Sequence, residues 1–171
     1  MALELVIPGS GKLSLEHLVL DYNGTIADRG QILPGVAERL RKLCTMMTVH
    51  VITADTFGTV RAEVAALFPD EQRSGRLVVD ILPPRESRPG RNEGEAKLDM
   101  LEGLGAGQCC AMGNGRNDVL MLKAAGLSFA VMGREGACAQ AFMSADAAVT
   151  NILDALDLLL EPQCCTATLR I

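Results

Sequence analysis

The sequence contains no tryptophan, and aromatic residues make up only 3% of its 171 residues. Aliphatic side chains and methionine must therefore fill the core, because 49% of the residues are still hydrophobic. No apolar run approaches the ~20 residues that a membrane-spanning helix needs. The N-terminus also lacks a basic segment followed by a hydrophobic one, which is the pattern of a signal peptide. We therefore expect a cytoplasmic protein that has no membrane partner.

Positive charge is also scarce. Lysine and arginine together number 16 against 21 acidic residues, which gives a formal net charge of −5. A surface that binds nucleic acid needs a cationic stripe. The single basic cluster, formed by Arg85, Arg88 and Arg91, is interpreted as part of a solvated loop. We therefore expect no nucleic-acid partner.

The six cysteines show no Cys-x-x-Cys spacing, so the sequence gives no indication of a structural zinc site. Cys109 and Cys110 fall in an apolar segment, where cysteine behaves as a small hydrophobic residue. Cys164 and Cys165 lie close to the C-terminus and are interpreted as reduced thiols in a tail.

The length suits one domain with a substantial core. Residues 3–15 have the pattern of a β-hairpin, and apolar strands then alternate with amphipathic helices. We predict strands at residues 17–21, 49–53, 77–82, 109–113, 127–132 and 147–149, and helices at residues 34–44, 59–68, 92–104, 117–125, 137–143 and 151–160. The prediction is an α/β protein: a Rossmann-like three-layer sandwich with a central parallel sheet. Residues 1–16 form a hairpin extension of this single domain, and residues 162–171, which follow the stop at Pro162, form a tail.

Two polar segments follow predicted strands. Asp21-Tyr22-Asn23-Gly24-Thr25 follows the first, and Gly113-Asn114-Gly115-Arg116-Asn117-Asp118 follows a later one. Ligands of parallel α/β sheets bind beyond the carboxyl ends of the strands, so both segments should meet at one edge. The first offers a carboxylate that can attack phosphorus, and the second offers oxygen ligands for a hard cation such as Mg²⁺.

Other residues extend this set. The turn at Gly24 can point backbone N–H groups at an anion. Thr53 ends the next predicted strand, where its hydroxyl can bond a phosphoryl oxygen, and Lys97 can neutralise phosphate charge. Each residue alone has an ordinary structural explanation, but their joint order at strand ends favours a phosphate site.

These motifs make the chain resemble the haloacid dehalogenase-like superfamily over residues 18–160. Val51-Ile52-Thr53-Ala54-Asp55 and the segment 113–118 are most similar to the phosphorylation domain of P-type ATPases. The resemblance implies Mg²⁺ as cofactor and an aspartyl-phosphate intermediate. It implies that Asp21 is the nucleophile and that Asn23, Thr53 and Lys97 complete the catalytic set. The implied phosphate-binding residues are Asn23, Gly24, Thr53, Ala54 and Lys97, and the implied metal ligands are Asp21, Asn23, Asn114 and Asp118.

Two positions depart from the family pattern. Asn23 stands where phosphatases of this family have an aspartate that acts as general acid and base, and Asn114 stands where a metal-binding aspartate is expected. Asn23 can still offer its backbone carbonyl to Mg²⁺, but it cannot transfer a proton. Proton transfer by a general acid or base typically increases a reaction rate by ~10²–10⁴-fold. We therefore expect slow hydrolysis and weak Mg²⁺ binding.

The spacing between motifs leaves no room for a cap domain or a nucleotide-binding domain. An open site suits a macromolecular substrate, or a small one enclosed by a neighbouring subunit. The leading hypothesis is a Mg²⁺-dependent phosphatase that acts on a phosphomonoester. The alternatives are a catalytically weakened phosphate- or phosphoprotein-binding regulator and a phosphotransfer protein. A homo-oligomer is expected, because the hairpin has an apolar edge that invites cover.

Overall fold

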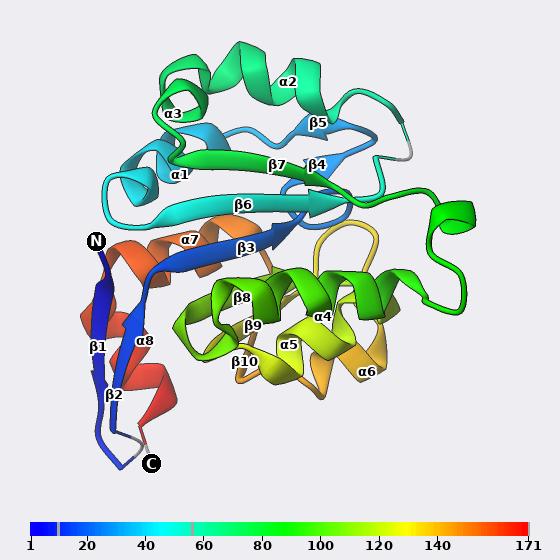
Figure 1. Ribbon diagram of the computed structural model, residues 1–171. Helices are drawn as coiled ribbons and strands as arrows, with labels where there is room; N and C mark the ends of the chain where they lie inside the picture. The colour runs from blue at the N-terminus through cyan, green and yellow to red at the C-terminus, as the bar shows by residue number, and fades with distance from the viewer. Residues whose placement is uncertain (10, 56, 171) are drawn as a thin grey trace.

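The centre of the molecule is a parallel six-stranded β-sheet (Figure 1). The computed structural model describes residues 1–9, 11–55 and 57–170. The sheet has the strand order β10-β9-β8-β3-β6-β7. Its strands are β3 (His17–Asp21), β6 (Thr48–Thr53), β7 (Leu77–Ile81), β8 (Cys109–Gly113), β9 (Leu127–Val131) and β10 (Ala147–Val149). The α/β fold with a central parallel sheet is thus confirmed.

Helices cover both faces of this sheet, as its strands require. All residues of β8 and β9 are buried, and a strand buried on both faces reads as a continuous apolar run. One face packs against α1 (Val36–Cys44), α2 (Val60–Leu67) and α7 (Ile152–Leu160). The other packs against α4 (Glu93–Leu104), α5 (Val119–Ala124) and α6 (Ala139–Phe142). Alternate residues of each central strand therefore enter two separate cores.

The start of α4 is fixed by a capping box. Asn92 accepts a hydrogen bond from the backbone N–H of Glu95, whose side chain accepts one from the backbone N–H of Asn92. An asparagine followed three residues later by a glutamate is a spacing typical of such a box. The box matters for the site because Lys97 lies one turn further along the same helix.

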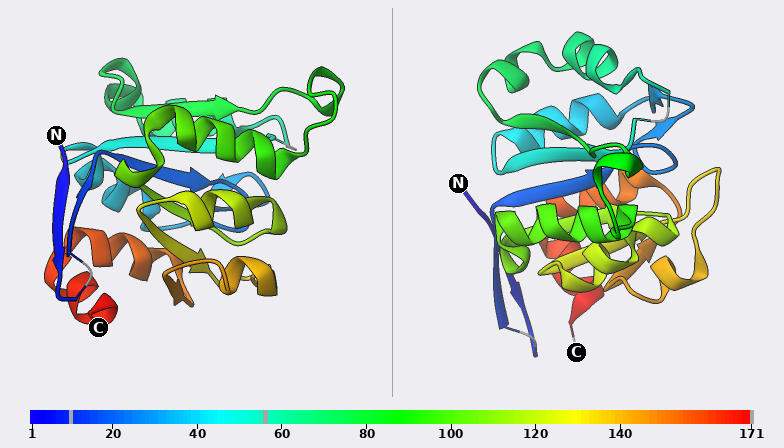
Figure 2. Two further views of the ribbon diagram at one scale, coloured as in Figure 1. Left: turned by 60° about the horizontal axis from the view of Figure 1, so that its bottom comes forward. Right: turned by 45° about the vertical axis from the view of Figure 1, so that its right-hand side comes forward.

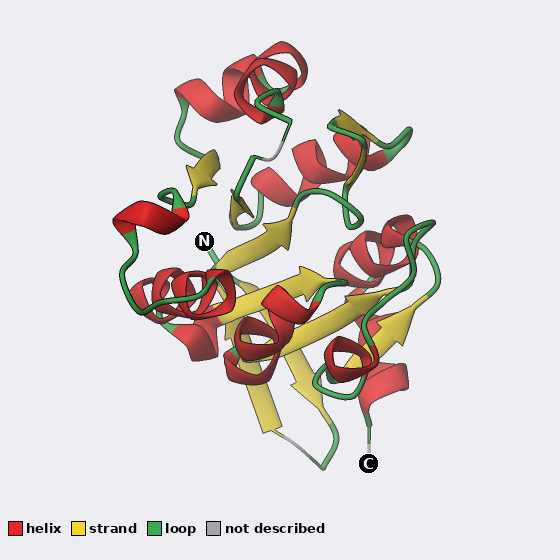
Figure 3. Cartoon of the chain, turned by 90° about the vertical axis from the view of Figure 1, so that its right-hand side faces the viewer, coloured by secondary structure: helices red, strands yellow, loops and turns green. Residues whose placement is uncertain are grey.

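The order of the strands creates a switch point beside β3. The chain runs from β3 outward to β6 and β7 and then returns to β8 on the other side of β3. Ligands of open α/β sheets bind outside the carboxyl ends of the strands at such a point. In the parallel register, Asp21 lies beside Ile52 of β6, and Leu20 lies beside Met112 of β8. Figure 3 views the molecule from this side.

The C-terminal segment differs from the prediction. It is not a tail: Pro162–Leu169 form helix α8, which packs against β1 and α7. Proline takes the first position of a helix without losing a hydrogen bond, so Pro162 starts α8 as well as ending α7. The hairpin of β1 (Leu3–Ile7) and β2 (Gly11–Leu15) lies beside α8, at the end of the sheet away from the carboxyl ends of β3 and β6 (Figures 1 and 2). Leu3, Leu5, Ile7 and Leu15 of the hairpin are therefore buried within the same chain, whereas Val6 is exposed.

Several short elements escaped prediction. They are β4 (Ala27–Asp28), β5 (Gln31–Ile32), α3 (Pro69–Arg73) and the 3-10 turns at Arg85–Ser87, Ala106–Gln108 and Arg116–Asp118. Segments of two to five residues carry too little periodicity to stand out from turns. In the part of the chain that is described, no helix has the length and apolar character to cross a membrane.

Candidate active site

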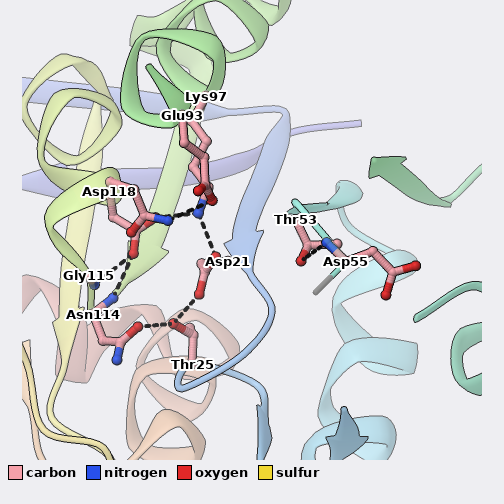
Figure 4. Close-up of polar contacts among 10 residues, drawn as sticks. Asp21, Thr25, Thr53, Asp55, Glu93, Lys97, Asn114, Gly115 and Asp118 are labelled. Carbon is pink, nitrogen blue, oxygen red and sulfur yellow. Dashed lines mark hydrogen bonds and ion pairs between the residues drawn. The ribbon is translucent and has the colours of Figure 1, made fainter. Parts of the chain in front are cut away.

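Lys97 lies at the centre of the candidate site, completely buried between two carboxylates (Figure 4). Its Nζ atom lies 2.5 Å from Oδ1 of Asp21 and 2.7 Å from Oδ1 of Asp118. Burial alone would lower the pKa of Lys97, but the charges of Asp21 and Asp118 and their hydrogen bonds raise it above its usual value. Lys97 is therefore a permanent cation that joins α4 to the ends of β3 and β8.

The Asp21 carboxylate at the end of β3 is held in an unusual electrostatic state. Burial, and then the neighbouring charge of Asp118, raise the pKa of Asp21 to about 7, although Lys97 opposes this. Two carboxylates share one ammonium group, so the fully ionised cluster carries one uncompensated negative charge. A buried negative charge of this kind favours the binding of a cation.

The segment after β8 fixes Asp118. Oδ2 of Asp118 accepts hydrogen bonds from the backbone N–H groups of Asn114, at 3.0 Å, and Gly115, at 2.8 Å. A Cβ atom on Gly113 would lie 2.5 Å from Cγ of Asp118, so only glycine permits this approach. Because both carboxylate oxygens have partners, Asp118 chiefly orients Lys97 and the loop.

Thr25 also belongs to the site, although the sequence motifs did not identify it as a functional residue. Its buried hydroxyl lies 3.2 Å from Oδ2 of Asp21 and 3.3 Å from Oδ1 of Asn114. The single hydroxyl proton can be donated to only one of them at a time. The sequence feature that could have identified Thr25 is its position directly after Gly24, in the same polar segment as Asp21.

The turn at Gly24 brings the two polar segments together. Gly24 has a φ of +79°, in the region that favours glycine, and a Cβ atom there would lie 2.5 Å from Nδ2 of Asn114. A larger residue at this position would strain the turn and displace the Asn114 side chain.

The two asparagine side chains are both engaged. Oδ1 of Asn23 accepts a hydrogen bond from the backbone N–H of Gly30 at 3.1 Å, so this side chain holds its own loop. Nδ2 of Asn114 donates to the carbonyl of Gly136 at 3.1 Å, which leaves its Oδ1 beside Thr25. Among the described residues, the carbonyl of Asn23 accepts no hydrogen bond. Its oxygen is therefore available to a ligand.

The predicted residues at the end of β6 stand apart from the Lys97 cluster. Thr53 is buried, and its hydroxyl accepts a hydrogen bond from the backbone N–H of Asp55 at 3.0 Å. Ala54 is exposed. Figure 4 shows Thr53 across from Asp21, and no hydrogen bond joins it to the cluster within the described residues. The structure brings together Asp21, Lys97, Asn114 and Asp118, with Thr53 at the next strand end.

The donor set at this edge fits Mg²⁺. The available oxygens are Oδ2 of Asp21, the carbonyl of Asn23 and Oδ1 of Asn114, and they are all hard ligands. Residues 1–9, 11–55 and 57–170 contain no group of three His, Cys, Asp or Glu side chains arranged to hold a metal ion. This is compatible with Mg²⁺, which usually binds one or two carboxylates, substrate phosphate and waters. Asp118, whose oxygens are largely taken, is the weakest member of the predicted ligand set.

Solved structures with the same architecture come from several bacteria. The cobalt-bound deoxy-D-mannose-octulosonate 8-phosphate phosphatase of Haemophilus influenzae superposes with a TM-score of 0.63 at 18% identity, over 87% of this chain and 89% of that one. The corresponding enzyme of Moraxella catarrhalis, in complex with magnesium, phosphate and KDO, gives 0.58 at 16% identity over 86% and 87%. A haloacid dehalogenase-like family protein of Streptococcus pneumoniae gives 0.60 at 12% identity over 84% and 97%. The chain has the haloacid dehalogenase-like fold.

One sequence relative is considerably more similar. An uncharacterized protein of Methanocaldococcus jannaschii is 46% identical over 79 residues, which are 44% of this chain and 85% of that protein. No family model matches the chain. The haloacid dehalogenase-like fold is thus established by architecture, and the chemistry must be argued from the site itself.

Proposed function

We propose that this protein is a Mg²⁺-dependent phosphomonoester hydrolase that works through an aspartyl-phosphate on Asp21. The observation that carries the proposal is the buried Asp21–Lys97–Asp118 cluster at the switch point of the sheet. A structural ion pair has no need of a second carboxylate, whose charge opposes ionisation of the first. Phosphatases with the same fold support the proposed reaction class.

We propose separate tasks for the two oxygens of Asp21, which have different neighbours. Oδ1 accepts from Lys97 and would use its other lone pair for attack, whereas Oδ2, which lies beside the Thr25 hydroxyl, would be the oxygen that ligates Mg²⁺. Attack on phosphorus forms the bond to Asp21 and breaks the ester bond, whose electron pair leaves with the alcohol oxygen. Because Asn23 cannot supply a proton, this oxygen takes one from water. A second water then attacks phosphorus, the bond to Asp21 breaks, and inorganic phosphate leaves.

Asp21, Asn23 and Asn114 would hold Mg²⁺, with Asp118 adjacent. When bound, the ion neutralises phosphoryl charge that would otherwise face two carboxylates. Lys97 favours the ionised form of Asp21 and so opposes the effects of burial and of Asp118, and Thr25 keeps Oδ2 of Asp21 aligned. Thr53 and Ala54, with the turn at Gly24, are proposed to bind the phosphoryl oxygens. The cytoplasmic location, the absence of a nucleic-acid or membrane partner and the likeness to P-type ATPases stay predictions from sequence.

One observation favours a second function, a phosphate-binding regulator or phosphotransfer protein with little turnover. The residue in the expected acid–base position, Asn23, is neutral and is bonded to Gly30. Such a protein would form or bind a phosphorylated species without releasing phosphate quickly. The two functions therefore differ in the rate of phosphate release and in the lifetime of phosphorylated Asp21.

Phosphate release from a panel of phosphomonoesters, with and without Mg²⁺, tests the proposal. We expect Mg²⁺-dependent turnover that is lost in Asp21→Asn and retained in Asp70→Asn, which alters an exposed carboxylate on α3. Intact-mass measurement after incubation with acetyl phosphate and Mg²⁺ detects the covalent intermediate. A long-lived phosphoprotein without turnover would favour phosphotransfer, and near-normal activity in Asp21→Asn would exclude this mechanism.

Mg²⁺ binding can be tested separately by titration calorimetry. Asn114→Asp adds a negative charge beside Thr25 and should tighten Mg²⁺ binding, although it removes the hydrogen bond to Gly136. If Asn114→Asp binds Mg²⁺ no more tightly than the wild type, Asn114 is not a ligand.

A further inference from the structure

A polar hollow, separate from the Asp21–Lys97–Asp118 cluster, lies beside the candidate active site. It has a volume of about 640 Å³ and is lined by the loop from Arg85 to Asn92 and by Glu93 and Glu95 at the start of α4. The loop follows β7, so it extends from the same edge of the sheet as Asp21 (Figures 1 and 3). Glu93 lies one helical turn before Lys97 on α4, and Figure 4 shows both residues on this helix. The hollow therefore adjoins the place where a phosphoryl group would bind.

The arginines of this hollow differ in whether they have ion-pair and hydrogen-bond partners. Arg91 forms an ion pair with Asp99. Nε of Arg88 donates to the carbonyl of Pro83 at 2.7 Å, but its Nη1 atom is buried and has no hydrogen-bond partner among residues 1–9, 11–55 and 57–170. Arg85 is exposed and makes neither an ion pair nor a side-chain hydrogen bond among the described residues. A buried, unpaired guanidinium N–H is unfavourable, so Arg88 would gain from an acceptor.

The two acidic residues that line the hollow already accept hydrogen bonds from other groups. Glu95 accepts the backbone N–H of Asn92 in the capping box. Glu93 accepts a hydrogen bond from Nδ2 of Asn117 at 2.7 Å. Neither carboxylate pairs with Arg85 or Arg88, which leaves these two guanidinium groups as the unsatisfied charges of the hollow.

The loop is built to hold these arginines. Pro83, Pro84 and Pro89 each fix a backbone φ angle. Successive turns join the backbone N–H of Ser87 to Pro84, that of Arg88 to Arg85 and that of Arg91 to Arg88. A loop restrained in this way loses less conformational entropy when it binds a ligand than a solvated flexible one.

We infer that Arg85 and Arg88 bind a second anionic group, a carboxylate or a phosphate, carried by the phosphomonoester whose phosphoryl group reaches Asp21. This inference deepens the proposed phosphatase function and rests on it. It gives the substrate class as a small molecule with two anionic ends. The loop before α4 would then supply the specificity that an absent cap cannot provide.

Matched series of substrates test this inference. We would compare alkyl phosphates from ethyl to hexyl with the same chains ending in a carboxylate or in a second phosphate. At the chain length that spans both sites, kcat/KM should exceed that of the alkyl phosphate by about 10-fold or more, the effect of a charge-assisted hydrogen bond. The double variant Arg85→Gln/Arg88→Gln should remove that preference. The control double variant Arg73→Gln/Arg76→Gln, just before the start of β7, makes the same change of charge at the other end of the sheet and should keep that preference.

Equal kcat/KM for the series in the wild type would overturn the inference, as would a preference that survives in the double variant. Calorimetry in an Asp21→Asn background separates this failure from failure of the phosphatase proposal. One outcome would support the anion site and reject the phosphatase proposal. In it, no ester is hydrolysed, but the dianionic compounds bind more tightly than the alkyl phosphates, and they do so only when Arg85 and Arg88 are present. Binding that is independent of the two arginines removes the anion site.

Discussion

At the residue scale, Lys97 is the side chain on which the arrangement of the site depends. Lysine in the first turns of a helix is usually solvated, yet here it is fully buried between Asp21 and Asp118. The sequence indicated its role only through its order relative to Asp21, Thr53 and Asp118. Its burial follows from tertiary packing of α4 against β3 and β8, which local pattern cannot show.

Lys97→Met should destabilise the protein strongly. Removing one partner of a buried ion pair typically costs about 3–5 kcal/mol, because the remaining charges are buried without compensation. Here two carboxylates would be left facing each other, so Mg²⁺ should recover part of the lost stability. Thermal unfolding with and without Mg²⁺ measures both effects. Lys42→Met is the control, because the exposed Lys42–Glu38 pair contributes little. A Tm for Lys97→Met equal to that of the control would show that the cluster does not stabilise the fold.

Asn23→Asp should raise the turnover of phosphomonoesters. A carboxylate in place of the amide can still accept the hydrogen bond from Gly30, so the loop should keep its conformation. In its protonated form, the new carboxyl group can also give a proton to the leaving oxygen, and general acid–base catalysis is typically worth about 10²–10⁴-fold. Steady-state kinetics on the best substrate of the panel measures the gain. An unchanged or lower kcat would mean that Asn23 serves another step, such as preserving the phosphorylated form.

At the element scale, long periodic segments were predictable and short or tertiary-dependent ones were not. The capping box at Asn92 and the N-cap at Asn151 are local interactions, in which each side chain accepts from a backbone N–H two or three residues further along the chain. Helix α8 was missed because Pro162 also ends α7 and because Cys164, Cys165 and its two threonines have low helix propensity. Contact with β1 and α7 stabilises α8, and burial of Cys165 raises the pKa of its thiol to about 11.

His17, His50 and Asp80 form a row of polar side chains across the neighbouring strands β3, β6 and β7. Nδ1 of His17 lies 3.2 Å from Nε2 of His50, and Nδ1 of His50 lies 3.1 Å from Oδ2 of Asp80. If Nδ1 of His50 donates to Asp80, its Nε2 can accept from His17 only while it carries no proton. Burial, and then the charge of His50, lower the pKa of His17. The pair therefore cannot readily hold two positive charges.

The row formed by His17, His50 and Asp80 predicts that the protein loses stability on acidification. Because the pKa of His17 is lower in the folded state than the ~6.5 of the unfolded chain, its contribution is present above that pH and is lost as pH falls. Between pH 7.5 and 5.5, the Tm of His17→Gln should fall less steeply than that of the wild type. Both proteins contain the Asp21 cluster, so a comparison at one Mg²⁺ concentration cancels its titration. Parallel Tm curves would show that His17 titrates freely.

At the scale of the whole molecule, the carboxyl edge of the sheet is the open side. The stretch between Asp21 and Thr53 forms β4, β5, α1 and β6, and the stretch between Thr53 and Lys97 forms α2, α3, β7, a 3-10 turn and the start of α4. Large apolar side chains are exposed in loops at this edge, with Phe57 at 53% and Met132 at 42%. The hairpin cannot shield this edge within the same subunit, because it lies at the far end of the sheet against α8 (Figure 1).

We therefore predict a homo-oligomer in which a neighbouring copy covers the carboxyl edge of the sheet. Burial of Phe57 and Met132 would favour association, since each Å² of apolar surface removed from water contributes about 25 cal/mol. It would also exclude water from the phosphoryl group, which assists transfer chemistry. Light scattering should give at least twice the 18.2 kDa of the chain, and Phe57→Ser/Met132→Ser should shift the mass toward the monomer, whereas Val6→Ser, on the distant hairpin, should not. A wild type that stays at 18.2 kDa at high protein concentration would rule out the oligomer and leave an exposed site suited to a macromolecular phosphoester.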